Sequence, residues 1–133
     1  MFRTTLAWAS FVLLIAVAFG AFGAHGLKAR LTPDELGQWH TSVQYQFYHG
    51  LAMLGLIGIG DRIRPKSLVW ARNFFLLGIL CFSGSLYLLS TRSLLDLHSI
   101  TPFLGPITPV GGLFFMAGWS VLLITALRPD RSH

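Results

Sequence analysis

The fold is decided by residues 32–60, whose sequence is TPDELGQWHTSVQYQFYHGLAMLGLIGIG. In this stretch a signal for the start of a helix leads directly into an uncharged run. Thr32 with Glu35 three positions later matches a capping box, and Pro33 suits the first helical position. Apolar side chains then recur on one helical face at Leu36, Trp39, Val43 and Phe47. The pattern predicts one helix that begins at Pro33 in the outer interface of a membrane, residues 33–42, and continues unbroken into a membrane span.

Four uncharged stretches indicate that the chain crosses a membrane four times. They cover residues 5–24, 43–60, 73–91 and 109–127, and each approaches the ~20 residues that a helix needs to cross ~30 Å of hydrocarbon. Charged residues make up 11% of the chain, against about 25% in soluble proteins. We therefore expect an all-α integral membrane protein, in which residues 1–133 form one four-helix bundle with short loops.

The connections between these spans differ in kind. Pro102 and Pro106, with a glycine between them, favour an irregular outer loop over residues 92–108. Thr108 followed by Pro109 is then predicted to cap the fourth span. Small residues follow the first span, as they do in cleavable signal peptides. Its apolar run is longer than a usual signal core, so we expect this span to be retained.

The distribution of Lys and Arg predicts the orientation. Of the ten Lys and Arg residues, three lie in the first and third connections, at Lys28, Arg30 and Arg92. The others lie at the N terminus, between the second and third spans and in the tail, at Arg3, Arg62, Arg64, Lys66, Arg72, Arg128 and Arg131. Positive loop charge resists translocation, so we expect both termini in the cytoplasm. The same clustering beside apolar runs argues against nucleic-acid binding.

Small residues aligned on one face of each span predict where the helices pack, since helices in lipid associate by close approach. The aligned residues are Ala9, Ala16, Gly20 and Gly23 in the first span, Ala52 and Gly55 in the second, Gly78, Cys81 and Ser85 in the third, and Gly111, Gly118 and Thr125 in the fourth. We expect these faces to meet in a compact bundle.

His49 is the clearest case of an ionisable residue at membrane depth. It lies twelve positions before Asp61, or roughly 18 Å into a core of about 30 Å. Ser85 reaches a similar depth, and Ser83 and Tyr87 are its neighbours on the third span. We expect a neutral imidazole that is hydrogen-bonded to one of these three side chains and has no catalytic purpose. The alternative is a ligand, proton or cofactor role.

Further polar residues accompany His49 on the second span, and others lie at its level on neighbouring spans. Together they define a candidate polar pocket on the outer half of the bundle. Its candidate residues are His25, Gln44, Tyr45, Tyr48, His49, Ser83, Ser85, Tyr87 and Thr108.

The sequence predicts no metal site, no cofactor and no catalytic residue. His25 and His40 share a level near water, but two histidines without a nearby carboxylate or thiolate make a weak metal site. Cys81 lies alone within an apolar run, so neither an intrachain disulfide nor a cysteine-based metal motif can form. The acidic residues near the spans lie at helix starts and interfaces, at Asp34, Glu35, Asp61 and Asp96. No carboxylate pair or nucleophile beside a base can be assembled from them.

Four motifs, in order along the chain, resemble those of a known family. They are GAFGAHGL at residues 20–27, YQFYH at 45–49, FSGSLY at 82–87 and ITPVGG at 107–112, followed by Trp119. The chain is similar over nearly its whole length to the small bacterial inner-membrane proteins of domain of unknown function family 423, the YgdD-like proteins, which have eukaryotic transmembrane relatives. The resemblance implies a four-span protein of the bacterial inner membrane and supplies no catalytic residues.

Three functional hypotheses follow from these observations. The first is a non-enzymatic structural or accessory membrane protein that packs against a larger complex or against copies of itself. The second is a binding protein or carrier whose outer polar pocket accepts a small ligand such as a quinone, a lipid headgroup or a metal. The third is a proton or ion pathway, which four short helices could form only as an oligomer.

Overall fold

The structure is a computed structural model that describes residues 1–128, so Arg131 lies outside the described residues. Helices account for most of this part of the chain, and it contains no strand, which confirms the all-α prediction. The elements in order are α1 Phe2–Phe22, the π-helix η1 Gly23–Leu27, α2 Pro33–Gly58, α3 Pro65–Gly78, the π-helix η2 Ile79–Ser83, α4 Gly84–Ser90 and α5 Thr101–Leu127.

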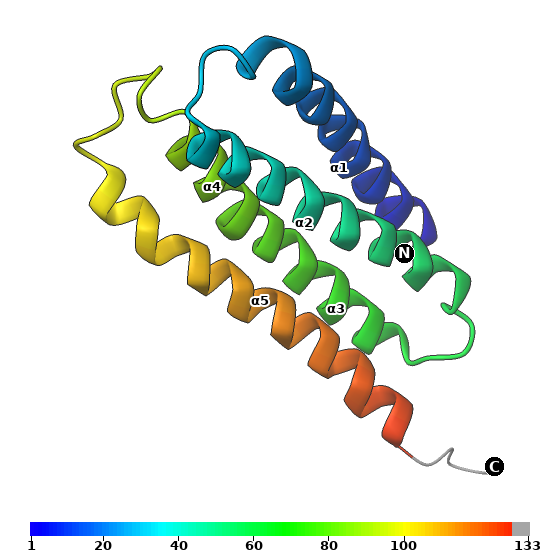
Figure 1. The fold of residues 1–133 in the computed structure, drawn as a ribbon. Helices are drawn as coiled ribbons and strands as arrows, with labels where there is room; N and C mark the ends of the chain where they lie inside the picture. The colour runs from blue at the N-terminus through cyan, green and yellow to red at the C-terminus, as the bar shows by residue number, and fades with distance from the viewer. Residues whose placement is uncertain (129–133) are drawn as a thin grey trace, which may run out of the picture.

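These elements form four helical rods that lie side by side (Figure 1). α1 continues into η1, and α3 continues through η2 into α4, so each of these series makes one rod. α2 and the α3–η2–α4 rod lie in the middle, while α1 and α5 lie on opposite flanks (Figure 1). α2 packs against α1 on one side and against η2 and α4 on the other, and α5 packs along α3, η2 and α4.

The start of α2 confirms the predicted capping box. The hydroxyl oxygen of Thr32 accepts a hydrogen bond from the backbone N–H of Glu35 at 3.3 Å, and the Glu35 carboxylate accepts one from the backbone N–H of Thr32 at 3.1 Å. Pro33 occupies the first turn, where its missing N–H costs no helical bond. From there α2 runs for 26 residues without interruption, as the sequence predicts.

The fourth helix begins earlier than the sequence predicts. Turns extend to residue 100 and α5 starts at Thr101, so the irregular loop expected over residues 92–108 is confirmed for its first half and wrong for residues 101–108. Thr108 lies inside the helix instead of capping it. Pro106 and Pro109 are both within α5. Proline in a helix interior removes a hydrogen bond and crowds the carbonyl of the preceding turn, so each proline weakens the helix locally, yet α5 continues to Leu127. Leu104 is buried and anchors the additional turns.

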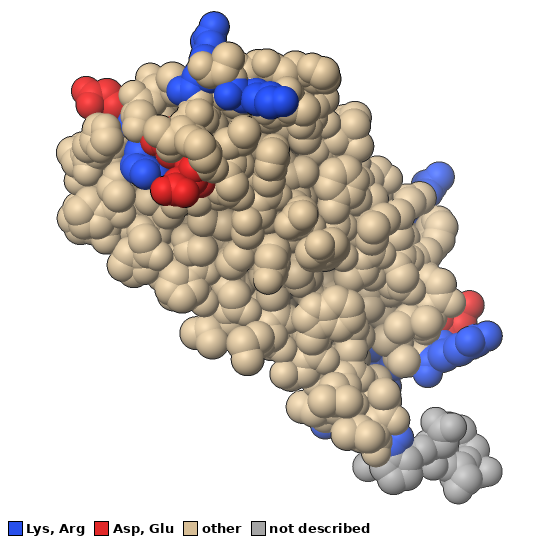
Figure 2. All heavy atoms as spheres, in the orientation of Figure 1, with Lys and Arg blue, Asp and Glu red and all other residues tan. Residues whose placement is uncertain are grey.

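Three stretches of helix are long and apolar enough to cross a membrane: Phe2–Leu27, Pro65–Ser90 and Thr101–Leu127. α2 has the length but does not meet the same standard of apolarity. Figure 2 shows that the charged side chains in view lie mainly toward the two ends of the molecule, with an uncharged zone between them. This distribution is typical of a protein whose middle is surrounded by lipid.

Most of the small residues singled out in the sequence lie at helix contacts. Ala9 and Ala16 of α1 are fully buried. A Cβ added to Gly118 would come within 2.6 Å of Phe75 in α3. Gly78 and Gly111 have even less room, because a Cβ at Gly78 would meet the ring of Phe115 and one at Gly111 would meet the backbone of Phe82.

The prediction for the second span is correct for Ala52, which packs against the buried core, and wrong for Gly55. Gly55 faces open space, with nothing within 4 Å of an added Cβ. Gly50 makes the close contact in its place, since a Cβ there would lie 2.8 Å from Leu13 of α1. Gly50 and Gly55 are five positions apart, so they point to nearly opposite sides of the helix.

Candidate functional site

The buried polar side chains of α2 connect this helix to the rods around it. Trp39 donates from its indole Nε1 to the backbone oxygen of Phe19 in α1 at 2.8 Å. Seven positions further on, Gln46 donates from Nε2 to the backbone oxygen of Val12 in α1 at 2.8 Å. Two buried side chains therefore bind α2 to α1 through backbone carbonyls.

Gln46 also binds α4. The Tyr87 hydroxyl donates to Oε1 of Gln46 at 2.7 Å. The Gln46 amide therefore accepts a hydrogen bond from α4 while it donates one to the Val12 carbonyl of α1. Tyr87 in turn packs its ring against Phe19 and Trp39, at centroid distances of 4.8 and 4.7 Å. Gln46 is therefore the side chain through which three rods share hydrogen bonds.

A reciprocal pair of serines links α2 to the π-helix η2. Ser42 donates from its hydroxyl to the backbone oxygen of Ser83 at 2.7 Å, and Ser83 donates to the backbone oxygen of Ser42 at 2.9 Å. Both serines are 0% exposed. A π-helix shifts the register of the residues that follow it and often marks a functional position. Here the η2 turn places Ser83 directly against α2.

His49 lies between α2 and α5. Its Nδ1 is 2.8 Å from the backbone oxygen of Tyr45, and its Nε2 is 3.2 Å from the indole Nε1 of Trp119. A carbonyl oxygen can only accept and an indole N–H can only donate, so the ring is neutral, with its hydrogen on Nδ1. The imidazole also stacks on Phe115, with ring centroids 3.5 Å apart and planes 9° apart.

The predicted hydrogen bond from His49 to the third span is therefore wrong. The depth count placed His49 level with Ser85, but it did not say which neighbour the helix faces. α5 supplies both the hydrogen-bond donor and the stacking ring. Ser85 faces α5 as well, and its hydroxyl lies 2.6 Å from the hydroxyl of Thr108.

The predicted polar pocket does not exist as one site. Its residues divide among the Tyr87 cluster, the Ser83 pair, the contact of Ser85 with Thr108, and His49 with its aromatic neighbours. His25, Gln44 and Tyr48 are exposed. Sequence reasoning missed Ser42 and Gln46 and singled out Trp39 only as an apolar residue, although the spacing of three and four residues places all three on one helical face with His49.

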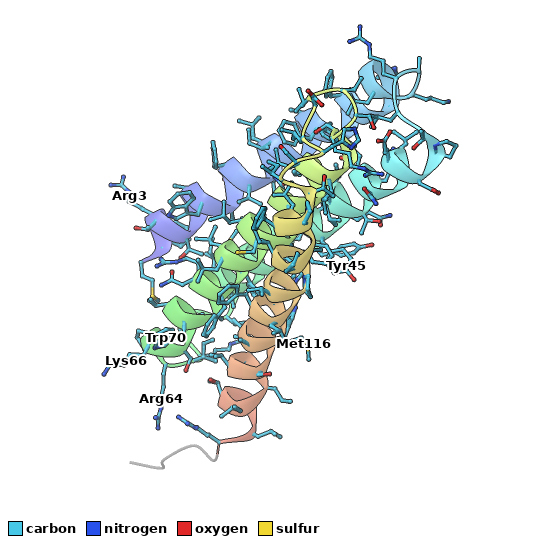
Figure 3. The ribbon with its side chains drawn as sticks, turned by 90° about the vertical axis from the view of Figure 1, so that its left-hand side faces the viewer. Arg3, Tyr45, Arg64, Lys66, Trp70 and Met116 are labelled. Carbon is cyan, nitrogen blue, oxygen red and sulfur yellow. The ribbon has the colours of Figure 1, made fainter. Side chains whose placement is uncertain are left out.

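A groove of about 440 Å³ opens beside His49 between α2, η2 and α5. Aromatic and apolar side chains form most of its wall: Tyr45, Phe82, Pro109, Gly112, Leu113, Phe115, Met116 and Trp119. Tyr45 and Met116 project on the same side of the molecule (Figure 3). No hydrogen bond within residues 1–128 uses the Tyr45 hydroxyl, so the groove offers one free polar group beside an occupied histidine.

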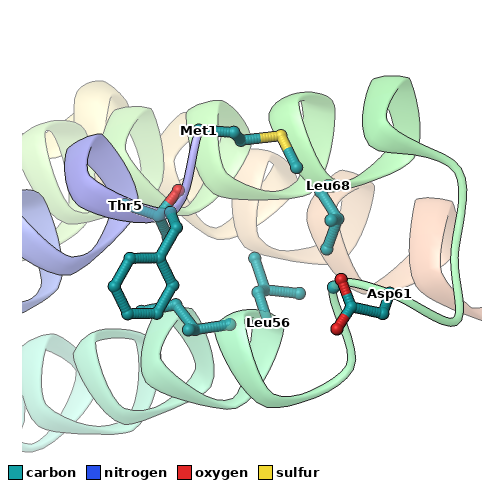
Figure 4. Close-up of a pocket in the computed structure, with 8 residues that line it drawn as sticks. Met1, Thr5, Leu56, Asp61 and Leu68 are labelled. Carbon is teal, nitrogen blue, oxygen red and sulfur yellow. The ribbon is translucent and has the colours of Figure 1, made fainter.

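A second pocket, of about 360 Å³, lies where the start of α1 meets the end of α2 and the start of α3 (Figure 4). It is lined by Met1, Phe2, Thr5, Leu56, Ile57, Gly60, Asp61 and Leu68. Its polar groups include the Asp61 carboxylate and the Thr5 hydroxyl, and the latter already accepts a hydrogen bond of 3.5 Å from Arg72. The described residues contain no group of three His, Cys, Asp or Glu side chains that could hold a metal ion in this pocket or elsewhere.

A buried carboxylate lies at the end of the molecule where α2 begins. Glu35 is 2% exposed and accepts a hydrogen bond of 2.6 Å from the Ser93 hydroxyl, in addition to its bond with Thr32. Arg92 lies 3.9 Å away and also donates to Gln38 at 3.2 Å. The hydrogen bonds from Ser93 and Thr32 lower the pKa of Glu35 against the opposing effect of burial. This carboxylate therefore ties the start of α2 to the segment between α4 and α5.

Comparisons with known proteins agree on one family. The model of the family described as protein of unknown function (DUF423) matches residues 19–112. The UPF0382 inner membrane protein YgdD of Escherichia coli (strain K12) is 40% identical over 129 residues, which cover 97% of this chain and 93% of that protein. The UPF0382 membrane protein YwdK of Bacillus subtilis (strain 168) is 37% identical over 116 residues, covering 86% of this chain and 89% of that protein.

A third relative, the UPF0382 membrane protein SH2409 of Staphylococcus haemolyticus (strain JCSC1435), is 39% identical over 115 residues, covering 86% of this chain and 88% of that protein. No solved structure matches the chain significantly. The relatives are named as membrane proteins, and the apolar helices of this structure fit that class. The chain belongs to the DUF423 family of small membrane proteins.

Proposed function

We propose that this chain is a non-enzymatic structural or accessory protein of the bacterial inner membrane, which packs against a partner protein or against copies of itself. Its four rods form a four-helix bundle that crosses the bilayer, with both termini in the cytoplasm. α2 belongs inside this bundle because its buried polar groups find partners there. The observation that carries the proposal is that within residues 1–128 no buried side-chain nitrogen or oxygen lacks a hydrogen-bond partner.

Such an interior leaves little chemistry for a reaction. A catalytic or ligand-binding group must keep a donor, an acceptor or a coordination position free for the substrate. His49 is the strongest candidate by depth, yet Tyr45 and Trp119 occupy its two nitrogens. The other buried polar side chains of α2 are likewise used to join helices. This distribution favours a scaffold over an enzyme or a proton relay.

The proposed orientation has its own support. Arg3, Arg62, Arg64, Lys66 and Arg72 flank the helix ends on the side that carries both termini, and excess positive charge is typical of the cytoplasmic side. Reporter fusions at Lys66 should read cytoplasmic, and fusions at Lys28 should read external. The reverse pattern at both positions would contradict this orientation.

Substitutions of His49 test the scaffold role. His49→Ala should leave the indole N–H of Trp119 without an acceptor, at a cost of about 0.6 to 2 kcal/mol for a hydrogen bond within a membrane. His49→Gln can place an amide oxygen near the position of Nε2, so it should recover most of that loss. Asparagine is shorter and reaches only the level of Nδ1, so it should recover less.

The measurement is unfolding of the full chain in detergent or bicelles, together with growth of cells that depend on the protein. If the protein is a scaffold, cell growth should fall in the same order as the unfolding free energy, from the original protein through the Gln and Asn variants to the Ala variant. If the Gln variant is as stable as the original and still loses function, imidazole chemistry is required and the proposal fails.

The groove beside His49 supports a second candidate function. Its aromatic wall and the free Tyr45 hydroxyl suit a small amphipathic ligand that reaches it from the lipid, such as a quinone or a lipid headgroup. Filling the groove with Gly112→Leu tests this candidate, because an added Cβ at Gly112 meets nothing within 4 Å. A variant that folds normally, loses function and no longer copurifies with a small molecule would favour binding over scaffolding.

A further inference from the structure

One face of α2 has no partner within the described chain. Its residues alternate at spacings of four and three: Gly37, Thr41, Gln44, Tyr48, Leu51, Gly55 and Gly58. We call this set the α2 seam. All of its members are exposed except Thr41, which is half-buried. A Cβ added to any of its three glycines would meet nothing within 4 Å, so the seam is open along its length.

Two polar side chains lie in this seam at membrane depth. Gln44 lies seventeen positions before Asp61 and Tyr48 thirteen, or about 25 and 20 Å from the inner boundary of a core of about 30 Å. No hydrogen bond among the described residues uses either side chain, and Tyr48 is 56% exposed. Lipid tails offer no hydrogen-bond partner, so at this level a side chain of a second protein molecule can satisfy the Gln44 amide.

The identity of that molecule follows from symmetry and charge. Copies of one chain share one orientation in the membrane, so two seams can meet in parallel with identical residues at identical depths. An amide both donates and accepts, so Gln44 can pair with Gln44 of a second copy. The seam contains no Lys, Arg, Asp or Glu, so identical faces do not repel one another.

The spacing fits the same arrangement. Alternation of three and four residues is the pattern by which two helices keep one face in contact along a shallow left-handed crossing. Gly55 and Gly58 would let the inner halves of the two helices approach closely. We infer that the chain forms a symmetric dimer through the α2 seam, with Gln44 paired across the axis. This inference rests on the proposed accessory role and specifies its partner as a second copy.

Oxidative crosslinking of the full-length chain in its native membrane tests the inference. In a Cys81→Ser background, single cysteines at Thr41, Gln44, Tyr48 and Leu51 should give disulfide-linked dimers, since their Cα atoms would lie within the roughly 7 Å that a disulfide spans. A cysteine at Tyr45 should form few dimers, because Tyr45 is turned about 100° around the helix from Gln44 and so lies outside the seam. Val17 of α1 is the matched control, because it is 58% exposed and lies at a similar depth.

A second measurement uses Gly55→Leu, which adds bulk to the seam without contacting the monomer's interior. The dimer fraction should fall about tenfold while helix content and unfolding stay unchanged, and Gln44→Leu should lower it about three- to tenfold. Val17→Leu, on the control face, should leave it unchanged.

Each outcome separates this inference from the proposed function. Dimers that link through Val17 but not through the seam would overturn the α2 interface and leave the accessory role intact. Seam cysteines that link instead to a different protein would overturn the second-copy assignment and support the larger-complex form of that role. If the chain is monomeric in its native membrane and no partner crosslinks at any position, both the inference and the proposed function fail.

Discussion

Adjacent glycines in α5 allow one packing contact to be tested against a nearly perfect control. A Cβ at Gly111 would run into the backbone N and Cα of Phe82 in η2, whereas a Cβ at Gly112 meets nothing within 4 Å. Both positions lie in the same helix, so alanine should improve intrinsic helix propensity equally at each, by up to about 1 kcal/mol. The difference between the two variants therefore isolates the steric contact.

The expected magnitude follows from what can move. Flexible side chains adjust at low cost, but the obstacle at Gly111 is backbone, so α5 must shift away from η2. Overpacking of this kind costs about 1 to 3 kcal/mol. The shift would also stretch the contact between Ser85 and Thr108 and the bond from Trp119 to His49. We expect Gly111→Ala to destabilise the fold by about 1 to 3 kcal/mol and Gly112→Ala to leave it unchanged or slightly more stable.

The assay is reversible unfolding of both variants in bicelles, followed by tryptophan fluorescence and helix content. Equal stabilities for the two alanine variants would refute the close approach of α5 to η2. A large loss in the Gly112 variant would show instead that the exposed side of α5 is covered, as a ligand in the groove or a protein partner would require.

Two further predictions concern the polar contacts of α2. Gln46→Leu should cost about 1 to 2 kcal/mol, because it leaves the Val12 carbonyl and the Tyr87 hydroxyl without their partners. Val17→Leu, at an exposed position of α1 outside the seam, is the control, and an equal loss of folding stability in both would contradict the network. Acid should weaken the contacts at the start of α2, since hydrogen bonds hold the folded pKa of Glu35 below its ordinary value of 4.5. That contribution is fully present above pH 4.5 and is lost as the pH falls through the lower, folded pKa. In detergent, Glu35→Gln should flatten this acid dependence of the melting temperature, and an unaltered dependence would contradict the assignment.

The features that were predicted correctly are those that neighbouring residues determine. The capping box at Thr32 and Glu35 needs only four consecutive residues, so the start of α2 could be read from the chain. The packing glycines of α5 follow from spacing along one helix. The start of α5 could not be found this way, because Pro102 and Pro106 signal a break locally, while the burial of Leu104 depends on the tertiary fold.

The candidate site was harder to predict, because depth and direction are separate pieces of information. Counting residues from Asp61 gives the level of His49 in a bilayer but not the neighbour it faces. Gln46 could not be identified for a related reason. It lies beside the apolar face that contains Trp39 and Val43, and that face predicts only packing. Its role depends on Val12 and Tyr87, which lie in two other helices.

The same contacts imply that α2 depends on its neighbours to be stable within a membrane. By composition it is the least apolar of the long helices and does not qualify as a span alone. Ser42, Gln46 and His49 become inexpensive to bury only when α1, η2 and α5 provide their partners. Gln46→Leu should therefore have two opposite effects, making α2 easier to insert on its own and weakening the assembled bundle. Insertion of an isolated α2 segment, compared with unfolding of the whole chain, would separate them. If the substitution hinders insertion, or strengthens the whole fold, then α2 is not held in place by its polar contacts.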